Sequence, residues 1–321
     1  MTGIRGLSAA RRRPGVLGVH SLDHFSMSVP DLEKAKNFYD AFGLDVRRNG
    51  CHLTLHTNDH PHCWGVLSEG HRKKLLYVSF GAFEDDLPRF REHLGAMNIE
   101  RLPAPPGFES NGLWFRNLDG LPIEIRVAEK VSPDFKSRFT APSAGPAVRG
   151  TISRSKAPTT RPRRLAHVAT YTSDVPRAVE FYTRVLGLRL SDSSEGNVAF
   201  MHGAHGSDHH MIALARSDGP GLHHCSWDVG GIQDVGLGAM QMANKGYDQG
   251  WGMGRHVLGS NYFHYIRDPW GSYSEYSADM DYIPADVDWA ASDHHGNDSF
   301  YLWGPSPPAD FVRNFETDNQ A

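Results

Sequence analysis

Three residues in the C-terminal part of the chain have side chains that suit metal binding and acid–base chemistry. His256, Tyr265 and Glu275 follow one another at intervals of nine and ten residues and supply an imidazole, a phenol and a carboxylate. Such a trio is also typical of an ordinary aromatic segment with one solvated Glu. Its meaning therefore depends on the elements that position it.

The segment around these residues predicts a β-hairpin. Two runs of strand-forming residues, Asn261–Arg267 and Ser272–Ser277, flank the sequence Asp-Pro-Trp-Gly at 268–271, which favours a turn. Residues of one parity share a face of a hairpin. Tyr265 and Glu275 are therefore expected to point into one cavity.

The length and composition describe an ordinary globular protein with two domains. The chain has 321 residues, of which 39% are hydrophobic and 22% are charged, and a domain takes about 150 residues. The net charge of -4 predicts no nucleic-acid partner and no attraction to a membrane surface. A small-molecule ligand is the expectation that remains.

The cysteines and the absence of a long apolar run favour a cytoplasmic protein. The three cysteines are odd in number and form no CxxC motif, which fits a reducing compartment without a disulfide framework. No run approaches 18 apolar residues, and the N-terminal segment lacks the apolar region of an export signal.

The chain repeats one unit, a strand followed by a helix and three strands, four times. In the first unit, Phe38 and Tyr39 stand fourteen and fifteen residues after His24. In the third unit, Phe181 and Tyr182 stand at the same two distances after His167. The helices are expected at 30–42, 84–94, 174–186 and 232–244, and are followed by Gly43, Gly95, Gly187 and Gly246. A repeat of this length usually determines the fold.

These units predict the domain organisation. A segment rich in Pro, Ser and Arg separates the second unit from the third. The expected parts are a flexible arm at 1–18, a first domain at 19–130, a linker or surface excursion at 131–163, a second domain at 164–290 and a covering tail at 291–321.

The second domain holds a candidate metal-ligand set. His167 lies on the first strand of the third unit, His224 on the first strand of the fourth, and Glu275 on the last strand of the fourth. Two imidazoles and one carboxylate form the facial arrangement of non-haem Fe(II) oxygenases, and Mn(II) is also acceptable. Such a set leaves positions open for a chelating substrate and for O2.

The first domain is an internal comparison, because it lacks one ligand of this set. His24 and Glu124 match the outer two ligands, and each Glu follows a turn glycine by four residues. Tyr77, however, occupies the place of the second histidine, and Trp114 that of the phenol. The first domain is expected to fold alike without holding a metal.

Further motifs reveal a family resemblance over about residues 20–290. A His-His pair stands before a short strand at 208–214, a second pair lies at 222–224, and His256, Tyr265 and Glu275 complete the pattern. With these motifs the chain resembles the type I extradiol ring-cleaving dioxygenases of the vicinal oxygen chelate superfamily. The resemblance implies an α+β fold in which four βαβββ units pair into two half-open β-barrel domains.

The resemblance also implies the activity and the roles of the site residues. The expected reaction is extradiol (meta) cleavage of a catecholic ring by O2, with both oxygen atoms incorporated, in the degradation of aromatic compounds. His167, His224 and Glu275 are expected to bind Fe(II), and relatives are commonly homo-oligomers.

The remaining site residues are expected to act on the substrate. His210 is assigned as the acid–base residue, because an unperturbed imidazole has a pKa near 6.5. Tyr265 is expected to donate a hydrogen bond to a substrate oxygen, and His256 to hold the other hydroxyl. The hairpin and the aromatic tail favour a substituted catechol or a trihydroxylated ring, without deciding which.

Two other functions stay open at this point. One is another metalloenzyme of the superfamily, such as a glyoxalase-like isomerase or a hydroxyphenylpyruvate-type dioxygenase, which would not need His210, His256 and Tyr265 together. The other is a non-catalytic protein that binds an aromatic compound, against which the intact ligand set argues. The additional histidines are expected to support the site or lie at the surface, and His202 is a candidate for the pocket wall; they are His202, His205, His209, His223 and His264.

Overall fold

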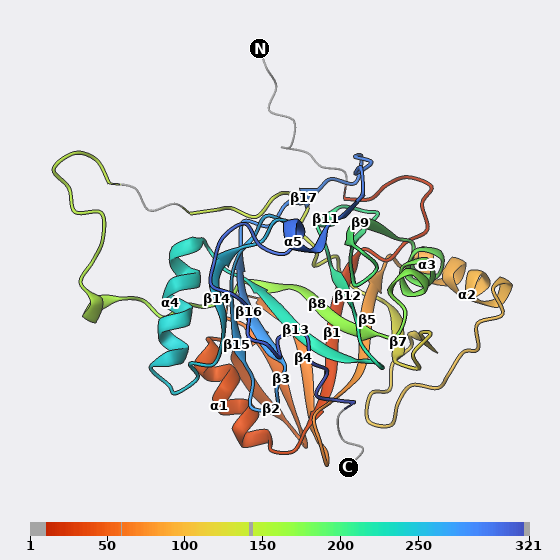
Figure 1. Cartoon of the computed structure of the whole chain (residues 1–321). Coiled ribbons are helices and arrows are strands. Elements are labelled where there is room, and N and C mark those ends of the chain that lie inside the picture. Colours follow the sequence, from red (N-terminus) through yellow and green to blue (C-terminus); the bar gives the residue numbers. More distant parts are fainter. Residues whose placement is uncertain (1–10, 59, 141–143, 318–321) are drawn as a thin grey trace.

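Two β-sheets, each with an antiparallel pair of strands at its centre, form the middle of the molecule, and helices cover their outer sides (Figure 1). The structure is a computed structural model, and it describes residues 11–58, 60–140 and 144–317. Most of the arm predicted at 1–18 lies outside the described residues. In the part of it that is described, Arg12 pairs with Asp85 at 2.8 Å and with Asp86 at 2.9 Å.

The first sheet contains seven strands in the order β2-β3-β4-β1-β5-β7-β6. All of them come from the first two repeat units. Their bounds are β1 Ser21–Val29, β2 Asp45–Asn49, β3 His52–Thr57, β4 His60–Glu69, β5 Lys74–Ala82, β6 Leu113–Arg116 and β7 Pro122–Val127.

The second sheet contains nine strands in the order β14-β15-β16-β13-β8-β12-β10-β9-β18. Its bounds are β8 Arg164–Thr172, β9 Leu188–Ser194, β10 Val198–Gly203, β12 Ile212–Arg216, β13 Gly221–Asp228, β14 Gly250–Arg255, β15 Tyr262–Arg267, β16 Tyr273–Ala278 and β18 Ser292–His294. A separate two-stranded sheet pairs β11 (Ser207–Asp208) with β17 (Tyr282–Ile283).

The same pairing rule builds both sheets. The first strands of two successive units lie antiparallel at the centre, as β1 with β5 and β8 with β13. Within each unit the first strand runs parallel to the last, as in β1 with β4, β5 with β7, β8 with β12 and β13 with β16. The four-unit organisation predicted from the repeat is therefore confirmed, and the two large sheets agree with the two half-open barrels that the family resemblance implies.

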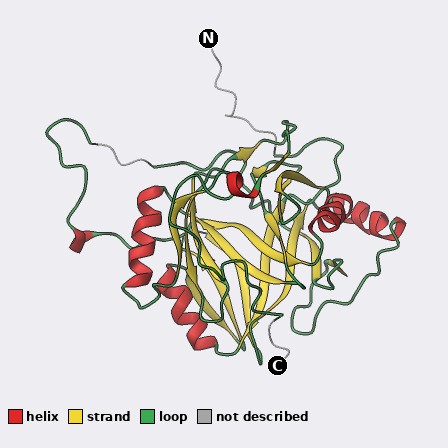
Figure 2. Cartoon of the chain, in the orientation of Figure 1, coloured by secondary structure: helices red, strands yellow, loops and turns green. Residues whose placement is uncertain are grey.

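The helices follow the repeat and pair across the two sheets. They are α1 Leu32–Phe42, α2 Asp86–Ala96, α3 Val175–Leu186 and α4 Ile232–Ala243, with a short α5 at Gly296–Ser299 and a 3-10 turn at Arg154–Lys156. α1 lies beside α4 on one side of the molecule, and α2 lies beside α3 on the other (Figure 2). The Phe42 ring at the end of α1 stacks on Tyr276 of β16 at 3.9 Å between centroids.

Two of the helices end at the predicted glycine, α4 ends at Ala243, three residues before Gly246, and α2 runs past its glycine. Gly43 and Gly187 adopt the left-handed conformation, with φ of 96° and 69°, as a glycine C-cap requires. α2 instead continues through Gly95, and Asn98 takes the left-handed conformation with φ of 54°. Asn tolerates this conformation through local side-chain hydrogen bonding, so the glycine was a misleading stop signal.

One of the three strands expected after the helix of the second unit is absent from the described residues. Leu102 makes only an isolated bridge to Trp114, and three prolines follow within four residues, at 103, 105 and 106. Proline cannot donate to a β-ladder. The second unit therefore contributes two strands after its helix.

The C-terminal tail belongs structurally to the second sheet. β18 pairs with β9 in parallel, and Phe311 packs in an aromatic cluster with Trp251, Tyr265 and Tyr273. Among the described residues, no helix is long and apolar enough to span a membrane.

Candidate metal centre and active site

Three ligand atoms converge on one face of the second sheet. His167 Nε2 and His224 Nε2 are 2.9 Å apart, and Glu275 Oε2 lies 3.4 Å from the first and 3.6 Å from the second. All three atoms fall within 4.8 Å of one another. They are the only such group of His, Cys, Asp and Glu side chains within the ranges that the structure describes.

The strand register explains why residues so far apart in sequence meet. Ser226 on β13 lies opposite both His167 on β8 and Glu275 on β16, so the three residues form one row across adjacent strands. His224 is two residues before Ser226 and therefore shares its face. Tyr265 on β15 extends the row, because it pairs with Glu275.

Burial sets the protonation of the ligand side chains in the metal-free protein. Desolvation lowers the pKa of His167 and of His224 well below the usual value, and the neighbouring imidazoles add to the shift. Desolvation also raises the pKa of Glu275 to about 8, against hydrogen bonds that lower it. The two imidazoles are thus neutral, as metal ligands must be.

The unsatisfied atoms of this group fit a divalent cation. Glu275 Oε2 is buried and has no hydrogen-bond partner among the described residues. Two imidazole nitrogens face each other and the same oxygen, which is unfavourable unless a proton or a cation lies between them. Two nitrogens and one oxygen match the ligand preference of Fe(II) and Mn(II).

Asn261 holds the carboxylate in place and was not predicted as a site residue. Its Nδ2 donates to Glu275 Oε1 at 3.1 Å and to Ser277 Oγ at 2.9 Å. Asn261 stood in the hairpin segment already singled out, but only this hydrogen bond shows that it faces Glu275.

His210 lies beside the ligand group and is oriented by its neighbour His209. The rings of His210 and His167 are 4.1 Å apart between centroids. His209 Nε2 donates to Asp192 Oδ2 at 2.8 Å, and the two Nδ1 atoms of the His-His pair are 3.1 Å apart. The contact with His209 uses Nδ1 of His210, and His210 borders the cavity of the site; among the described residues no hydrogen bond to its Nε2 is found.

His256 and Tyr265 form a hydrogen-bonded pair at the other side of the group. His256 Nδ1 is 2.8 Å from the carbonyl oxygen of Phe300, which can only accept, so this nitrogen carries the proton. Burial lowers the pKa of His256 to about 4, so the ring is neutral and its Nε2 accepts from the Tyr265 hydroxyl at 2.9 Å. Phe263 stacks on the His256 ring at 4.0 Å.

All six predicted site residues border one cavity of about 440 Å³. This is the size range of pockets that bind small ligands. Its apolar wall includes Phe200, Leu258, Phe300, Phe311 and Val312. Leu258 stands two residues after His256. The last three come from the tail, where no periodic pattern indicated a role in the site.

The other histidines divide between support and packing. His223 borders the cavity, whereas His202 does not, because its Nδ1 turns to Ser191 Oγ at 2.7 Å behind the His-His pair. His205 Nε2 donates to the carbonyl of Gly18 at 3.2 Å. Cys225 is fully buried and packs in the hydrophobic core.

The equivalent group of the first domain is closed by protein hydrogen bonds. His24 lies in the position of the first ligand, and its two ring nitrogens contact Asp23 at 2.7 Å and the Tyr77 hydroxyl at 3.0 Å. Glu124 accepts hydrogen bonds from the hydroxyl groups of Ser79 and Ser110. Every polar atom that would bind a metal is thus occupied.

Comparisons with known proteins agree with this geometry. Residues 164–276 match the model of the Glyoxalase/Bleomycin resistance protein/Dioxygenase superfamily. The chain is 48% identical over 308 residues to "Metapyrocatechase 2" of Cupriavidus necator, covering 96% of this chain and 95% of that protein.

Two solved structures share the fold. The Mn(II)-bound glyoxalase from Novosphingobium aromaticivorans superposes with a TM-score of 0.74 at 24% identity, covering 91% of this chain and 93% of that one. Homoprotocatechuate 2,3-dioxygenase from Arthrobacter globiformis gives a TM-score of 0.74 at 20% identity, with 93% and 92% covered. Together with the close sequence relative, they show that this chain belongs to the extradiol ring-cleaving dioxygenases of the vicinal oxygen chelate superfamily.

Proposed function

We propose that this protein cleaves a catecholic ring beside its two hydroxyl groups, using O2 and a metal held by His167, His224 and Glu275. The observation that carries the proposal is the convergence of these three ligand atoms at the base of a cavity that His210, His256 and Tyr265 also border. The metal is Fe(II), with Mn(II) as the alternative ion that the same donor set accepts. Bound there, the metal supplies the centre through which electron density passes from a chelated catechol to O2.

The chain's own residues prepare the substrate for this reaction. In the substrate-free structure the Tyr265 hydroxyl donates to His256 Nε2. A bound substrate takes over this donor, so that Tyr265 stabilises an ionised substrate oxygen. His256 Nε2 is then free to accept from the second hydroxyl while its Nδ1–H stays on the Phe300 carbonyl.

We assign proton transfer to His210, which lies beside the ligand group. Its contact with His209 uses Nδ1, and its ring lies against His167. Proton transfer by such a positioned group contributes about 10²–10⁴-fold to a rate. Both atoms of O2 enter the product, a ring-opened acid with a carbonyl group, so the reaction needs no external reductant.

The cavity wall favours an apolar substituent on the ring. Leu258, Phe300 and Phe311 contribute apolar surface to the cavity wall. Burial of an apolar group contributes about 25 cal/mol per Å² of surface removed from water. The proposed substrate is therefore a catechol with an apolar substituent.

The remaining predictions about the whole protein are also proposals. The division at about residues 130 and 164 is supported by the separate strand sets of the two sheets. A homo-oligomeric state and a cytoplasmic location stay predictions from the sequence.

Oxygen consumption with a panel of catechols tests the proposed reaction. The protein, reduced and loaded with Fe(II), is mixed with catechol and with alkyl- and chloro-substituted catechols. A yellow ring-opened product and equimolar O2 uptake are expected, with higher kcat/KM for the apolar substituents. If metal is bound and no catechol yields product, ring cleavage is refuted, and a glyoxalase-like isomerase becomes the better assignment.

A further inference from the structure

We propose that His223 is a positioning residue that fixes the metal-binding tautomer of His224 and is itself fixed by a backbone carbonyl of the C-terminal tail. The inference rests on the proposed function, because it takes His224 as a metal ligand. His223 is buried between the ligand group and the tail, and the proposed chemistry gives it no role of its own.

The direction of each hydrogen bond follows from what each atom can do. His223 Nε2 lies 2.9 Å from the carbonyl oxygen of Phe311, which only accepts, so His223 carries its proton on Nε2. A neutral imidazole that carries its proton on Nε2 offers a lone pair on Nδ1, so His223 Nδ1 is an acceptor. This Nδ1 is 2.6 Å from His224 Nδ1, which must therefore be the donor.

The consequence reaches the metal centre. With its proton on Nδ1, His224 has a lone pair on Nε2, the atom that lies 2.9 Å from His167 Nε2. The opposite tautomer would direct an N–H at the metal position and prevent binding. Partners that orient a metal-binding histidine in this way typically change metal affinity by about 10–100-fold.

The two histidine ligands differ in this support. His167 Nδ1 is buried and has no hydrogen-bond partner among the described residues, so no acceptor there holds a proton on that atom. His224 is thus the ligand whose orientation depends on another part of the protein.

The tail that supplies the carbonyl is held at several points. Arg267 pairs with Asp310 through two contacts at 2.7 and 2.6 Å, immediately before Phe311. Beyond Phe311, the Tyr171 hydroxyl donates to the backbone carbonyl of Arg313 at 2.9 Å.

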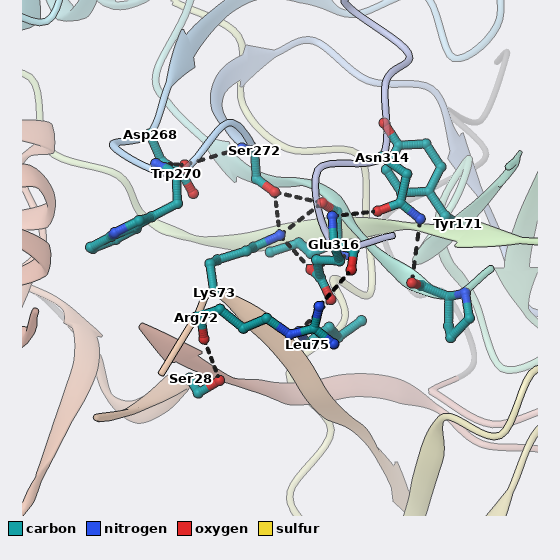
Figure 3. Close-up of polar contacts among 12 residues, drawn as sticks. Ser28, Arg72, Lys73, Leu75, Tyr171, Asp268, Trp270, Ser272, Asn314 and Glu316 are labelled. Carbon is teal, nitrogen blue, oxygen red and sulfur yellow. Dashed lines mark hydrogen bonds and ion pairs between the residues drawn. The ribbon is translucent and has the colours of Figure 1, made fainter. Parts of the chain in front are cut away.

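The last anchor joins the tail to the first domain (Figure 3). Glu316 accepts from Lys73 Nζ at 2.5 Å and from the backbone amides of Leu75 at 2.8 Å and Leu222 at 2.9 Å. Leu222 directly precedes His223 on β13. The same tail segment therefore holds both the strand that carries His223 and the carbonyl that orients its ring.

Metal binding by a matched pair of variants tests this role. Asn and Leu are similar in size, but only Asn keeps an oxygen near the place of the imidazole Nδ1, so His223→Asn and His223→Leu differ mainly in the acceptor offered to His224. His264→Leu is the control. His264 is a half-buried imidazole next to the site residue Tyr265, and the Nδ1 of His264 has no hydrogen-bond partner in the described chain. Dissociation constants for Co(II) are measured by competition with a chelator, together with the visible spectrum of the bound ion and the Tm with and without metal.

The outcomes separate a positioning role from a structural one. We expect His223→Leu to weaken Co(II) binding by about 10–100-fold, to alter the spectrum and to reduce the metal-induced rise in Tm, while His223→Asn retains most of the affinity. The metal-free Tm is compared first, and a folded Asn variant that binds as weakly as a folded Leu variant overturns the inference. Equal affinity of His223→Leu and the wild type also overturns it.

A separate measurement needs no variant at His223. In the metal-free wild type, 15N-histidine spectra are expected to show one neutral Nε2–H imidazole coupled to a neutral Nδ1–H imidazole through a hydrogen bond. The absence of this coupled pair of imidazoles would refute the proposed orientation of His224 by His223. If the wild type binds no Co(II), the proposed metal site itself fails, and this result is distinct from failure of the His223 role.

Discussion

Replacing Lys73 by Met tests how strongly the tail anchor stabilises the protein. The Lys73 and Glu316 side chains are 4% and 6% exposed, and their charged atoms are 2.5 Å apart. Removal of one partner from a buried ion pair costs about 3–5 kcal/mol, because the other charge is left without compensation. Two backbone amides still donate to the Glu316 carboxylate, so we expect a loss near the lower end, about 3 kcal/mol.

The double variant Lys73→Met/Glu316→Gln distinguishes this explanation from a loss of packing. Gln keeps an oxygen that can accept from an amide donor of Leu75 or Leu222 but carries no charge, so the variant is expected to regain about half of the lost stability or more. Urea unfolding of the metal-free protein, followed by circular dichroism, measures the free energies. A loss of about 3 kcal/mol corresponds to a fall in Tm of roughly 6–12 °C.

Two results would refute this reasoning. If Lys73→Met lowers the free energy of unfolding by less than about 1 kcal/mol, the pair behaves like an exposed ion pair. If the double variant is as unstable as the single variant, an uncompensated Glu316 charge is not the cause.

Three further predictions concern the metal and the catalytic groups. Metal binding at pH 7 is expected to release close to one proton, because the metal-free Glu275 carboxyl, with its pKa raised to about 8, must ionise to bind. The metal affinity therefore rises with pH up to about 8. Calorimetry in buffers of different ionisation enthalpy measures the number of protons released, and a value of zero at pH 7 would contradict this prediction. The chain is expected to bind one metal ion, since the polar atoms of the first-domain group already have partners; metal analysis giving two ions per chain would show this to be wrong. His210→Ala is expected to keep the metal and lose about 10²–10⁴-fold in kcat, and loss of the metal in that variant would instead identify His210 as a ligand.

Most of the fold that could be predicted from the sequence, namely the order of strands and helices in each unit, followed from the internal repeat. Each unit begins with a strand and ends with a strand parallel to it, so equivalent positions such as His167 and His224 were expected on neighbouring strands. Periodicity and glycine C-caps located the helices, except where Asn98 replaced Gly95 as the left-handed residue.

The parts that could not be predicted depend on contacts between distant segments. The tautomer of His224 depends on the carbonyl of Phe311, and a backbone atom carries no residue-specific signal. The tail residues that line the cavity follow no period, and Asn261 acquires its role only through its contact with Glu275. Local patterns determine elements, whereas such contacts arise only once the sheet has formed.

The central claim is that the chain inserts both atoms of O2 into a catecholic ring at the site formed by His167, His224 and Glu275. Mass spectrometry of the product formed under 18O2 by the Fe(II)-loaded protein tests it most directly, with Glu275→Ala as the matched variant. The account predicts a ring-opened product that carries two 18O atoms, allowing for exchange of the carbonyl oxygen with water, and no product from the variant. A product with a single 18O under conditions without exchange, or undiminished turnover by Glu275→Ala, would contradict it.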